Sequence, residues 1–214
     1  IWEGENLDCL FNQVYDVQIQ AGKIEVCAAL AGVSRAPFFR YTLQVAVSEN
    51  GRITLALDGH IRENCIWLPR LGFEFELPKS NGAFSYYGMG PNENYCDMNH
   101  AAHMGIFHST AQQEYVPYIR PQEHGNHTQV RWLQIGALRF EGCFEAAVSA
   151  YSTRQIEKAQ HINELSQPYA THLRIDYQCA GIGSHSCGPE LPEPYRLTDK
   201  EIHFHFTIAP QNRP

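Results

Sequence analysis

Residues 41–57, YTLQVAVSENGRITLAL, contain two runs of alternating apolar and polar residues on either side of Asn50-Gly51. Alternation with a period of two is typical of a β-strand that buries one face. An Asn-Gly pair between two such runs is typical of a type I′ turn, because both of its central positions need φ > 0. The stretch therefore predicts a β-hairpin.

Strand patterns dominate the rest of the chain as well. A second hairpin is expected over residues 14–30, with its turn near Ala21-Gly22-Lys23. Further strands are expected at residues 138–140, 144–150, 173–177 and 202–208, the last of them ending at Pro210. One short helix is expected at 153–159, where Ser152 and Gln155 fit a capping box. Many one-sided strands are most simply buried by packing two antiparallel sheets together, so we predict an all-β fold.

Composition limits the classes of function. The 214 residues suit one large β-domain over residues 1–214, and the formal net charge is −7 with scattered Lys and Arg. A nucleic-acid partner is not expected, because phosphate binding needs a concentrated basic surface. No run of 18 apolar residues is present, so no membrane span is expected.

The cysteines and the N-terminal residues indicate the compartment in which the protein is found. The seven cysteines include no CxxC pair, which argues against zinc-ribbon and thioredoxin-like sites. We expect free thiols in a reducing compartment, and hence a cytoplasmic protein. The N-terminus shows no signal-peptide pattern, although the chain begins with Ile1 and is interpreted as a fragment whose parent could carry a signal upstream.

Three loop segments carry more specific information than the strand pattern. They are GMGPNENYCD at 88–97, PYIRPQEHG at 117–125 followed by Arg131, and GIGSHSCGP at 181–189. In order and spacing they resemble motifs of the family-two β-galactosidases, a family of glycoside hydrolases. The resemblance extends over the whole chain and is strongest between residues 68 and 189.

The resemblance implies the C-terminal domain of such an enzyme, also called its small chain or domain 5. The fold implied is a galactose mutarotase-like supersandwich of two antiparallel sheets, N-terminally truncated and without the catalytic barrel. The parent enzyme would hydrolyse terminal β-galactosides such as lactose, as a homo-oligomer with Mg and Na in its barrel. The fragment itself would hold no cofactor, carry no catalytic residue and be inactive in isolation. Its partners would be the β-galactoside and the barrel domain or large subunit.

The third motif is the first candidate site. By resemblance, the 181–189 loop lies at the mouth of the galactoside pocket, so His185, Ser186 and Cys187 become candidate substrate-binding residues. A family member has Trp at the position of Cys187, where it stacks on the sugar. Cysteine has no flat aromatic face, so this stacking role does not transfer.

The second motif suggests another candidate site. Sugars are held by bidentate polar groups and by an aromatic face. Residues of this kind cluster in and after the motif, namely Arg120, Glu123, His124, Asn126, Arg131 and Trp132. The alternative is structural: Arg120 and Arg131 would pair with Glu123 and Glu93, and Trp132 would be a core residue, as large aromatics in strands usually are.

Metal binding and nucleophilic catalysis are two further chemistries for which the sequence offers plainer explanations. His203 and His205 share one face of a predicted strand, but no nearby acid or thiol completes a metal site, so an exposed strand face is preferred. Cys187 has His185 two residues away but no third group to orient that histidine, so a nucleophilic role is not expected.

Three functions remain open from the sequence. The first is a non-catalytic accessory domain of a β-galactosidase, which completes the substrate pocket and supports assembly. The second is an autonomous aldose 1-epimerase with a His acid and a Glu base, and the third is a carbohydrate-binding module. The three motifs belong to the galactosidase branch and favour the first; similarity of fold to mutarotase cannot supply function.

Overall fold

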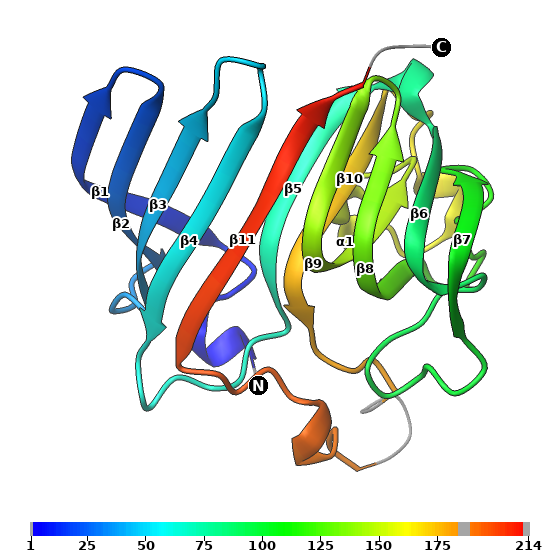
Figure 1. The fold of residues 1–214 in the computed structure, drawn as a ribbon. Coiled ribbons are helices and arrows are strands. Elements are labelled where there is room, and N and C mark those ends of the chain that lie inside the picture. The colour runs from blue at the N-terminus through cyan, green and yellow to red at the C-terminus, as the bar shows by residue number, and fades with distance from the viewer. Residues whose placement is uncertain (1, 184–188, 212–214) are drawn as a thin grey trace.

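The computed structural model describes residues 2–183 and 189–211, and strands dominate it (Figure 1). The strands are β1 (Leu10–Gln20), β2 (Lys23–Gly32), β3 (Phe39–Val47), β4 (Ile53–Ile61), β5 (Arg70–Pro78), β6 (Ala83–Gly90), β7 (His103–Thr110), β8 (Asn126–Ile135), β9 (Leu138–Ser149), β10 (Ala170–Cys179) and β11 (Glu201–Pro210). In the described part of the chain one α-helix, α1 (Thr153–Lys158), accompanies the short 3₁₀ helices η1 (Trp2–Glu5), η2 (Lys79–Asn81), η3 (Ile162–Glu164) and η4 (Glu193–Tyr195).

The hairpin predicted from residues 41–57 is present as β3 and β4, which pair antiparallel along their whole length. Its turn differs from the prediction, because Gly51 has φ of 76° whereas Asn50 does not have a positive φ. Gly51 N donates to Ser48 O over 2.9 Å, and Ser48 N donates to Arg52 O over 2.9 Å. The connection is a five-residue loop with one left-handed glycine, so the predicted type I′ turn is wrong.

Most other predicted elements are confirmed. β1 and β2 meet at a two-residue turn in which Gly22 has φ of 72°. β10 and β11 contain the predicted strands at 173–177 and 202–208. At α1 the Ser152 hydroxyl accepts the Gln155 N–H while the Gln155 side chain accepts the Ser152 N–H, which is the predicted capping box.

The prediction of two strands around Gly142 is wrong, because β9 runs unbroken past this residue. Its register against β8 shifts here: Trp132 faces Glu141, whereas Val130 faces Phe144. A bulge of this kind bends a strand without ending it. The local glycine signal therefore marks a bend inside a strand.

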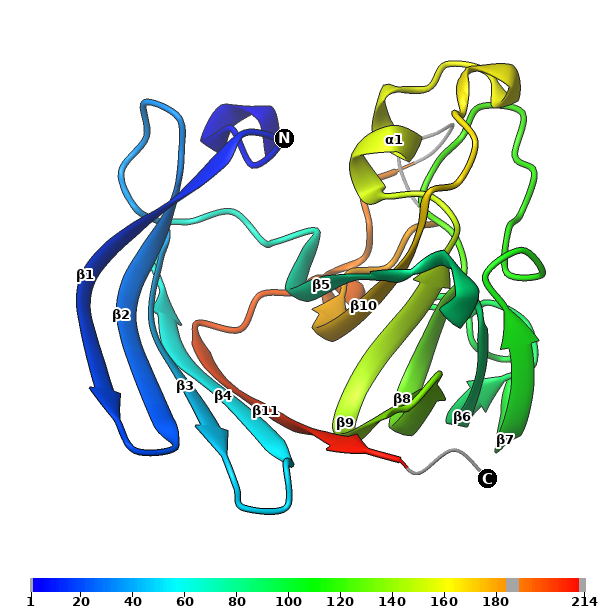
Figure 2. The ribbon, with the colours of Figure 1, turned by 90° about the horizontal axis from the view of Figure 1, so that it is seen from above.

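The eleven strands form one antiparallel sheet that branches at β9. The main path runs β1-β2-β3-β4-β11-β9-β8-β6-β7, and β10 pairs with β9 and β5 away from this path. The first part of β9 pairs with β11, and the second part pairs with β10. Figure 2 shows β5 and β10 on the concave side of the curved layer that contains β1 to β4 and β11. The all-β antiparallel prediction is confirmed, although the two layers are parts of one sheet.

Phenylalanine side chains join the two layers. Phe73 and Phe75 of β5 pack on Phe206 of β11, with ring centroids 5.7 and 6.3 Å apart. Phe75 also lies edge-on to Phe140 of β9 at 5.5 Å. This packing buries one face of β5 and β10, and it leaves their opposite face for the polar groups described below.

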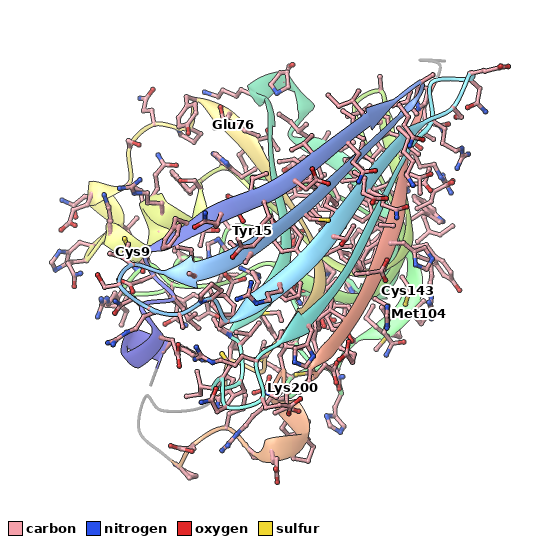
Figure 3. All side chains as sticks on the ribbon, turned by 90° about the vertical axis from the view of Figure 1, so that its left-hand side faces the viewer. Cys9, Tyr15, Glu76, Met104, Cys143 and Lys200 are labelled. Carbon is pink, nitrogen blue, oxygen red and sulfur yellow. The ribbon has the colours of Figure 1, made fainter. Side chains whose placement is uncertain are left out.

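β1 differs from every other described strand because all of its residues are exposed. Val14, Val17 and Ile19 are 53%, 49% and 76% exposed, and β1 pairs only with β2 within the described residues. Figure 3, which looks onto this side of the molecule, shows the strand with Tyr15 in the foreground. β1 thus presents a free edge and uncovered apolar side chains.

Candidate functional site

One face of β10 and its neighbours carries charged side chains that are buried. Leu173 and Ile175 point into the core, so the alternating residues Arg174 and Asp176 point to the other side. Asp176 lies directly opposite Glu145 of β9. Arg174, Asp176 and Glu145 are only 5%, 1% and 9% exposed, so these charges need partners.

Glu123 supplies such a partner from the loop between β7 and β8. Arg70 Nη1 and Nη2 donate to Glu123 Oε2 and Oε1 over 3.1 and 3.0 Å, and Arg174 donates to the same oxygens over 3.1 and 2.9 Å. Tyr95 Oη donates to Oε1 over 3.3 Å, and Arg70 Nε donates to Asp176 over 2.8 Å. Bidentate arginine–carboxylate pairs are strong and directional. These five residues form what we call the arginine–glutamate cluster.

The charges in this cluster set the protonation of its acids. Burial alone raises the pKa of Glu123, but the adjacent guanidinium groups of Arg174 and Arg70 outweigh it and lower the pKa to about 2. Burial raises the pKa of Asp176, and the two arginines only partly offset this effect. Glu123 is therefore a weak base at neutral pH. Its negative charge balances positive charges that would otherwise be buried alone.

Glu145 lies at the edge of the same face and has different surroundings. Burial raises the pKa of Glu145 to about 7, although a hydrogen bond from Asn126 lowers it and the charge of Asp176 raises it further. Asn126 Nδ2 donates to Glu145 Oε2 over 2.8 Å, and the Cys179 N–H donates to the same oxygen over 3.3 Å. Near neutral pH this carboxyl group is a mixture of the neutral and ionised forms.

The first two motifs are joined by hydrogen bonds through Glu93. Its Oε1 accepts from Tyr118 Oη over 2.7 Å, and its Oε2 accepts from the Gly125 N–H over 2.8 Å. Asn94 extends the connection, because its Oδ1 accepts from the Thr128 N–H over 2.9 Å. Both carboxylate oxygens of Glu93 are thus engaged in holding one loop to the other.

Three of the residues considered for sugar binding lie together. Glu123 belongs to the arginine–glutamate cluster, and Asn126 is bonded to Glu145. His124 is 4% exposed, with Nδ1 2.7 Å from Gln122 O and its ring edge-on to Tyr115. These side chains contact other protein groups closely, and Glu123 alone of the three reaches a cleft.

The other three candidates lie elsewhere. Arg120 and Arg131 are exposed, and the partners of Glu123 are Arg70 and Arg174 instead. Trp132 is half-buried and faces Tyr87 and Glu141 across the strands, with the Arg139 guanidinium 4.2 Å above its ring. Trp132 comes six positions after Asn126 in β8, which is roughly 20 Å along a strand. The six candidates therefore do not form one site.

Several residues of the cluster were not among the sequence candidates. Arg174 and Asp176 alternate with Leu173 and Ile175, a pattern that equally fits a strand with a solvated face. Arg70 stands in the stretch LPRLG at 68–72, and this position gave no indication of its partner. The sequence does contain these three charged residues. Their proximity could be inferred only from the pairing of β5 with β10.

A cleft of about 1090 Å³ opens beside the cluster. Arg70 and Glu123 line it from one side, and Arg154 lies on the α1 side. Trp2 and Trp67 contribute aromatic surface, with their ring centroids 4.7 Å apart. Its lining also includes Gly181 and Ile182, so the cleft reaches the beginning of the third motif.

Of the third motif, the structure describes residues 181–183 and Pro189. His185, Ser186 and Cys187 lie outside the described residues. Cys179, the last residue of β10, and the four residues after it form what we call the loop root (residues 179–183). Hydrogen bonds to Asp97 and to other groups hold it.

Within residues 2–183 and 189–211 no group of three or more His, Cys, Asp or Glu side chains is arranged to hold a metal ion. His203 Nδ1 lies 2.7 Å from Asp58 Oδ1 on an exposed strand face. No helix in the described part of the chain is long and apolar enough to cross a membrane.

Fold and motifs together define a β-sandwich domain with motif-bearing loops over a buried ionic cluster. Residues 1–208 match the family described as "Beta galactosidase small chain". The chain belongs to this family.

Individual relatives agree with this assignment. The β-galactosidase of Actinobacillus pleuropneumoniae is 30% identical over 213 residues, covering 97% of this chain and 21% of that protein. The β-galactosidase of Staphylococcus xylosus is 31% identical over 221 residues, covering 97% and 22%. That of Kluyveromyces lactis is 27% identical over 227 residues, again covering 97% and 22%. The chain therefore spans about a fifth of the length of these curated relatives.

Proposed function

We propose that this chain is the accessory small-chain domain of a β-galactosidase that hydrolyses terminal β-galactosides such as lactose. In this proposal the loop over residues 181–189 completes the substrate pocket, with His185, Ser186 and Cys187 near the sugar. The observation that carries it is the family match over residues 1–208, combined with a span of about a fifth of the matched β-galactosidases. A partner domain or large subunit would hold the catalytic carboxylates.

The acids of the motifs support a non-catalytic role for the chain itself. A retaining glycosidase needs one free nucleophilic carboxylate and one proton donor about 5–5.5 Å apart on either side of the sugar bond. Glu123 is bonded on both oxygens by arginines, and Glu93 is bonded on both by Tyr118 and Gly125. Neither carboxylate is free to attack a sugar or to protonate a leaving group.

The remaining features of the assembly are proposals of the same kind. The parent would be a homo-oligomer, with Mg and Na bound outside this chain. A cytoplasmic location is supported by the free state of the six cysteines within the described residues, since thiols persist in reducing compartments.

The test is a chromogenic β-galactoside assay on two proteins. The isolated 214-residue chain should give no turnover above background. In the complete β-galactosidase that contains or binds this chain, Cys187→Trp should change the affinity for the sugar while the enzyme still assembles.

Turnover by the isolated chain that disappears in Glu123→Gln or Glu93→Gln would overturn the accessory role. An unchanged affinity in both Cys187→Trp and Ser186→Ala enzymes would remove the loop from the substrate pocket.

A further inference from the structure

Residues 180–183 of the loop root have no helix or strand structure, yet hydrogen bonds fix the whole root. Every backbone N–H from 179 to 183 has an acceptor outside the root. The first three bonds are Cys179 to Glu145 Oε2 at 3.3 Å, Ala180 to Pro69 O at 2.9 Å and Gly181 to Tyr195 O at 3.0 Å. These acceptors come from three separate segments, so the root is fixed from several directions.

One side chain, Asp97, takes the last two bonds. The Ile182 N–H donates to Asp97 Oδ1 over 3.2 Å, and the Gly183 N–H donates to Oδ2 over 2.8 Å. Successive backbone N–H groups that point at one carboxylate form a small anion-binding cradle. Asp97 therefore holds the last two described residues before the 184–188 segment.

The glycines of this motif are explained by the same carboxylate. A Cβ on Gly181 would lie 2.4 Å from Asp97 Cγ, and a Cβ on Gly183 would lie 2.9 Å from Oδ2. Distances below 3.0 Å are too short for a side-chain carbon. The first and third positions of Gly181-Ile182-Gly183 must therefore lack a side chain if the carboxylate is to approach this closely.

Asp97 is itself held in place by the arginine–glutamate cluster. Tyr95 N and Met98 O are 3.1 Å apart, and Met98 N donates back to Tyr95 O over 2.9 Å, which closes a tight turn around Asp97. The Tyr95 hydroxyl donates to Glu123 over 3.3 Å. The ionic cluster thus anchors one side of the turn that presents the Asp97 carboxylate to the loop root.

We propose that Asp97 is a positioning residue for galactoside binding, acting by fixing the loop root, whose Gly181 and Ile182 line the cleft. This inference rests on the proposed function, because it assigns a role within the same substrate pocket. Asp97 does not touch the sugar in this scheme. It holds the N–H groups of Ile182 and Gly183, so that the loop root is already fixed before the substrate arrives and less ordering is needed on binding.

The experiment compares variants of the complete β-galactosidase that contains or binds this chain. Asp97→Asn replaces one acceptor oxygen with an NH₂ donor, so one of the two N–H groups loses its partner. We expect KM for a β-galactoside, and the inhibition constant of a competitive galactoside analogue, to rise about tenfold, the scale of one charged hydrogen bond. The value of kcat should change much less. The matched control is Asp58→Asn on the exposed face of β4, which should leave both constants unchanged.

Gly183→Ala tests the same contact from the other side, because its Cβ must displace Asp97 Oδ2. If Asp97 and Gly183 share one interaction, KM should rise in the double variant by less than the product of the two single-variant increases. Asp97→Glu keeps the negative charge, so its KM should lie between those of the wild type and Asp97→Asn. It also provides the test if the Asp97→Asn enzyme does not assemble.

Two outcomes separate this inference from the proposed function. If Cys187→Trp changes sugar affinity while Asp97→Asn and Gly183→Ala behave like Asp58→Asn, the positioning role is overturned and the accessory role stands. If the variants at 186 and 187 have no effect either, the proposed pocket itself is wrong. A fall in kcat and thermal stability with KM unchanged would make Asp97 merely structural.

Discussion

Glu145 is a carboxyl group whose surroundings favour its neutral form. Burial raises its pKa to about 7, whereas an unfolded glutamate has a pKa of about 4.3. Between these two values the folded chain binds a proton that the unfolded chain has released. Stability therefore falls as the pH rises through this window, and above it the cost is roughly 4 kcal/mol.

The corresponding prediction is that Glu145→Gln stabilises the chain in a pH-dependent way. Glutamine keeps an oxygen that accepts from Asn126 and from the Cys179 N–H, but it cannot ionise. The gain in the free energy of unfolding should be about 1 kcal/mol at pH 5 and should reach roughly 4 kcal/mol at pH 8. Urea denaturation at both pH values measures it, with Glu190→Gln as an exposed control. A gain that is equal at pH 5 and pH 8 would contradict the raised pKa.

At the scale of single elements, β1 is the least protected part of the described sheet. Its outer edge has no partner within the described residues, and Asp16 is the only charged residue in it. Sheet edges usually avoid pairing with other chains through charges, prolines or short length. This eleven-residue strand has one register shift, between Val14 and Asp16, as its main irregularity.

We therefore expect the isolated chain to self-associate through β1. Ile19→Lys places a charge on the most exposed apolar position of the strand and should shift the chain toward monomer. It should change the free energy of unfolding by no more than about 0.5 kcal/mol, as surface substitutions usually do. Light scattering after size exclusion measures this, and Gln44→Lys on β3 is the control. A wild-type chain that stays monomeric at high concentration would show that the edge is not adhesive.

At the scale of the whole molecule, an ionic cluster joins loops and sheet. Arg70 begins β5, Arg174 lies in β10, and Glu123 comes from the loop before β8. Removing one partner of such a buried set leaves an uncompensated charge, which typically costs 3–5 kcal/mol. The cluster therefore has a structural role in the domain, which argues against the epimerase alternative.

An aldose 1-epimerase would need a Glu base and a His acid open to the sugar. Glu123 is held by two arginines with a pKa of about 2, and His124 is buried. The isolated chain should therefore not accelerate the interconversion of galactose anomers. Polarimetry on freshly dissolved α-galactose tests this expectation. Acceleration that is lost in His124→Ala would instead favour the epimerase.

Local sequence patterns determined several of the strands and the class of fold. Alternation of apolar and polar residues is a property of neighbours in the chain, so β3, β4, β10 and β11 were predictable from it. The same holds for the Ser152–Gln155 capping box, whose partners are three residues apart. Three short motifs in the right order likewise indicated the β-galactosidase family from the sequence alone.

The ionic partners were decided by the tertiary structure. Glu123 pairs with Arg70 and Arg174, which are 53 and 51 residues away, rather than with the nearby Arg120 or Arg131. Arg70 and Arg174 meet because β5 pairs with β10, with a register shift between Asp176 and Gln178. A further slip of one residue would turn every side chain to the opposite face. The same is true of Asp97, whose two N–H donors lie 85 and 86 residues further along the chain. Sequence spacing holds no information on such contacts, since they depend on how strands and loops are brought together in space.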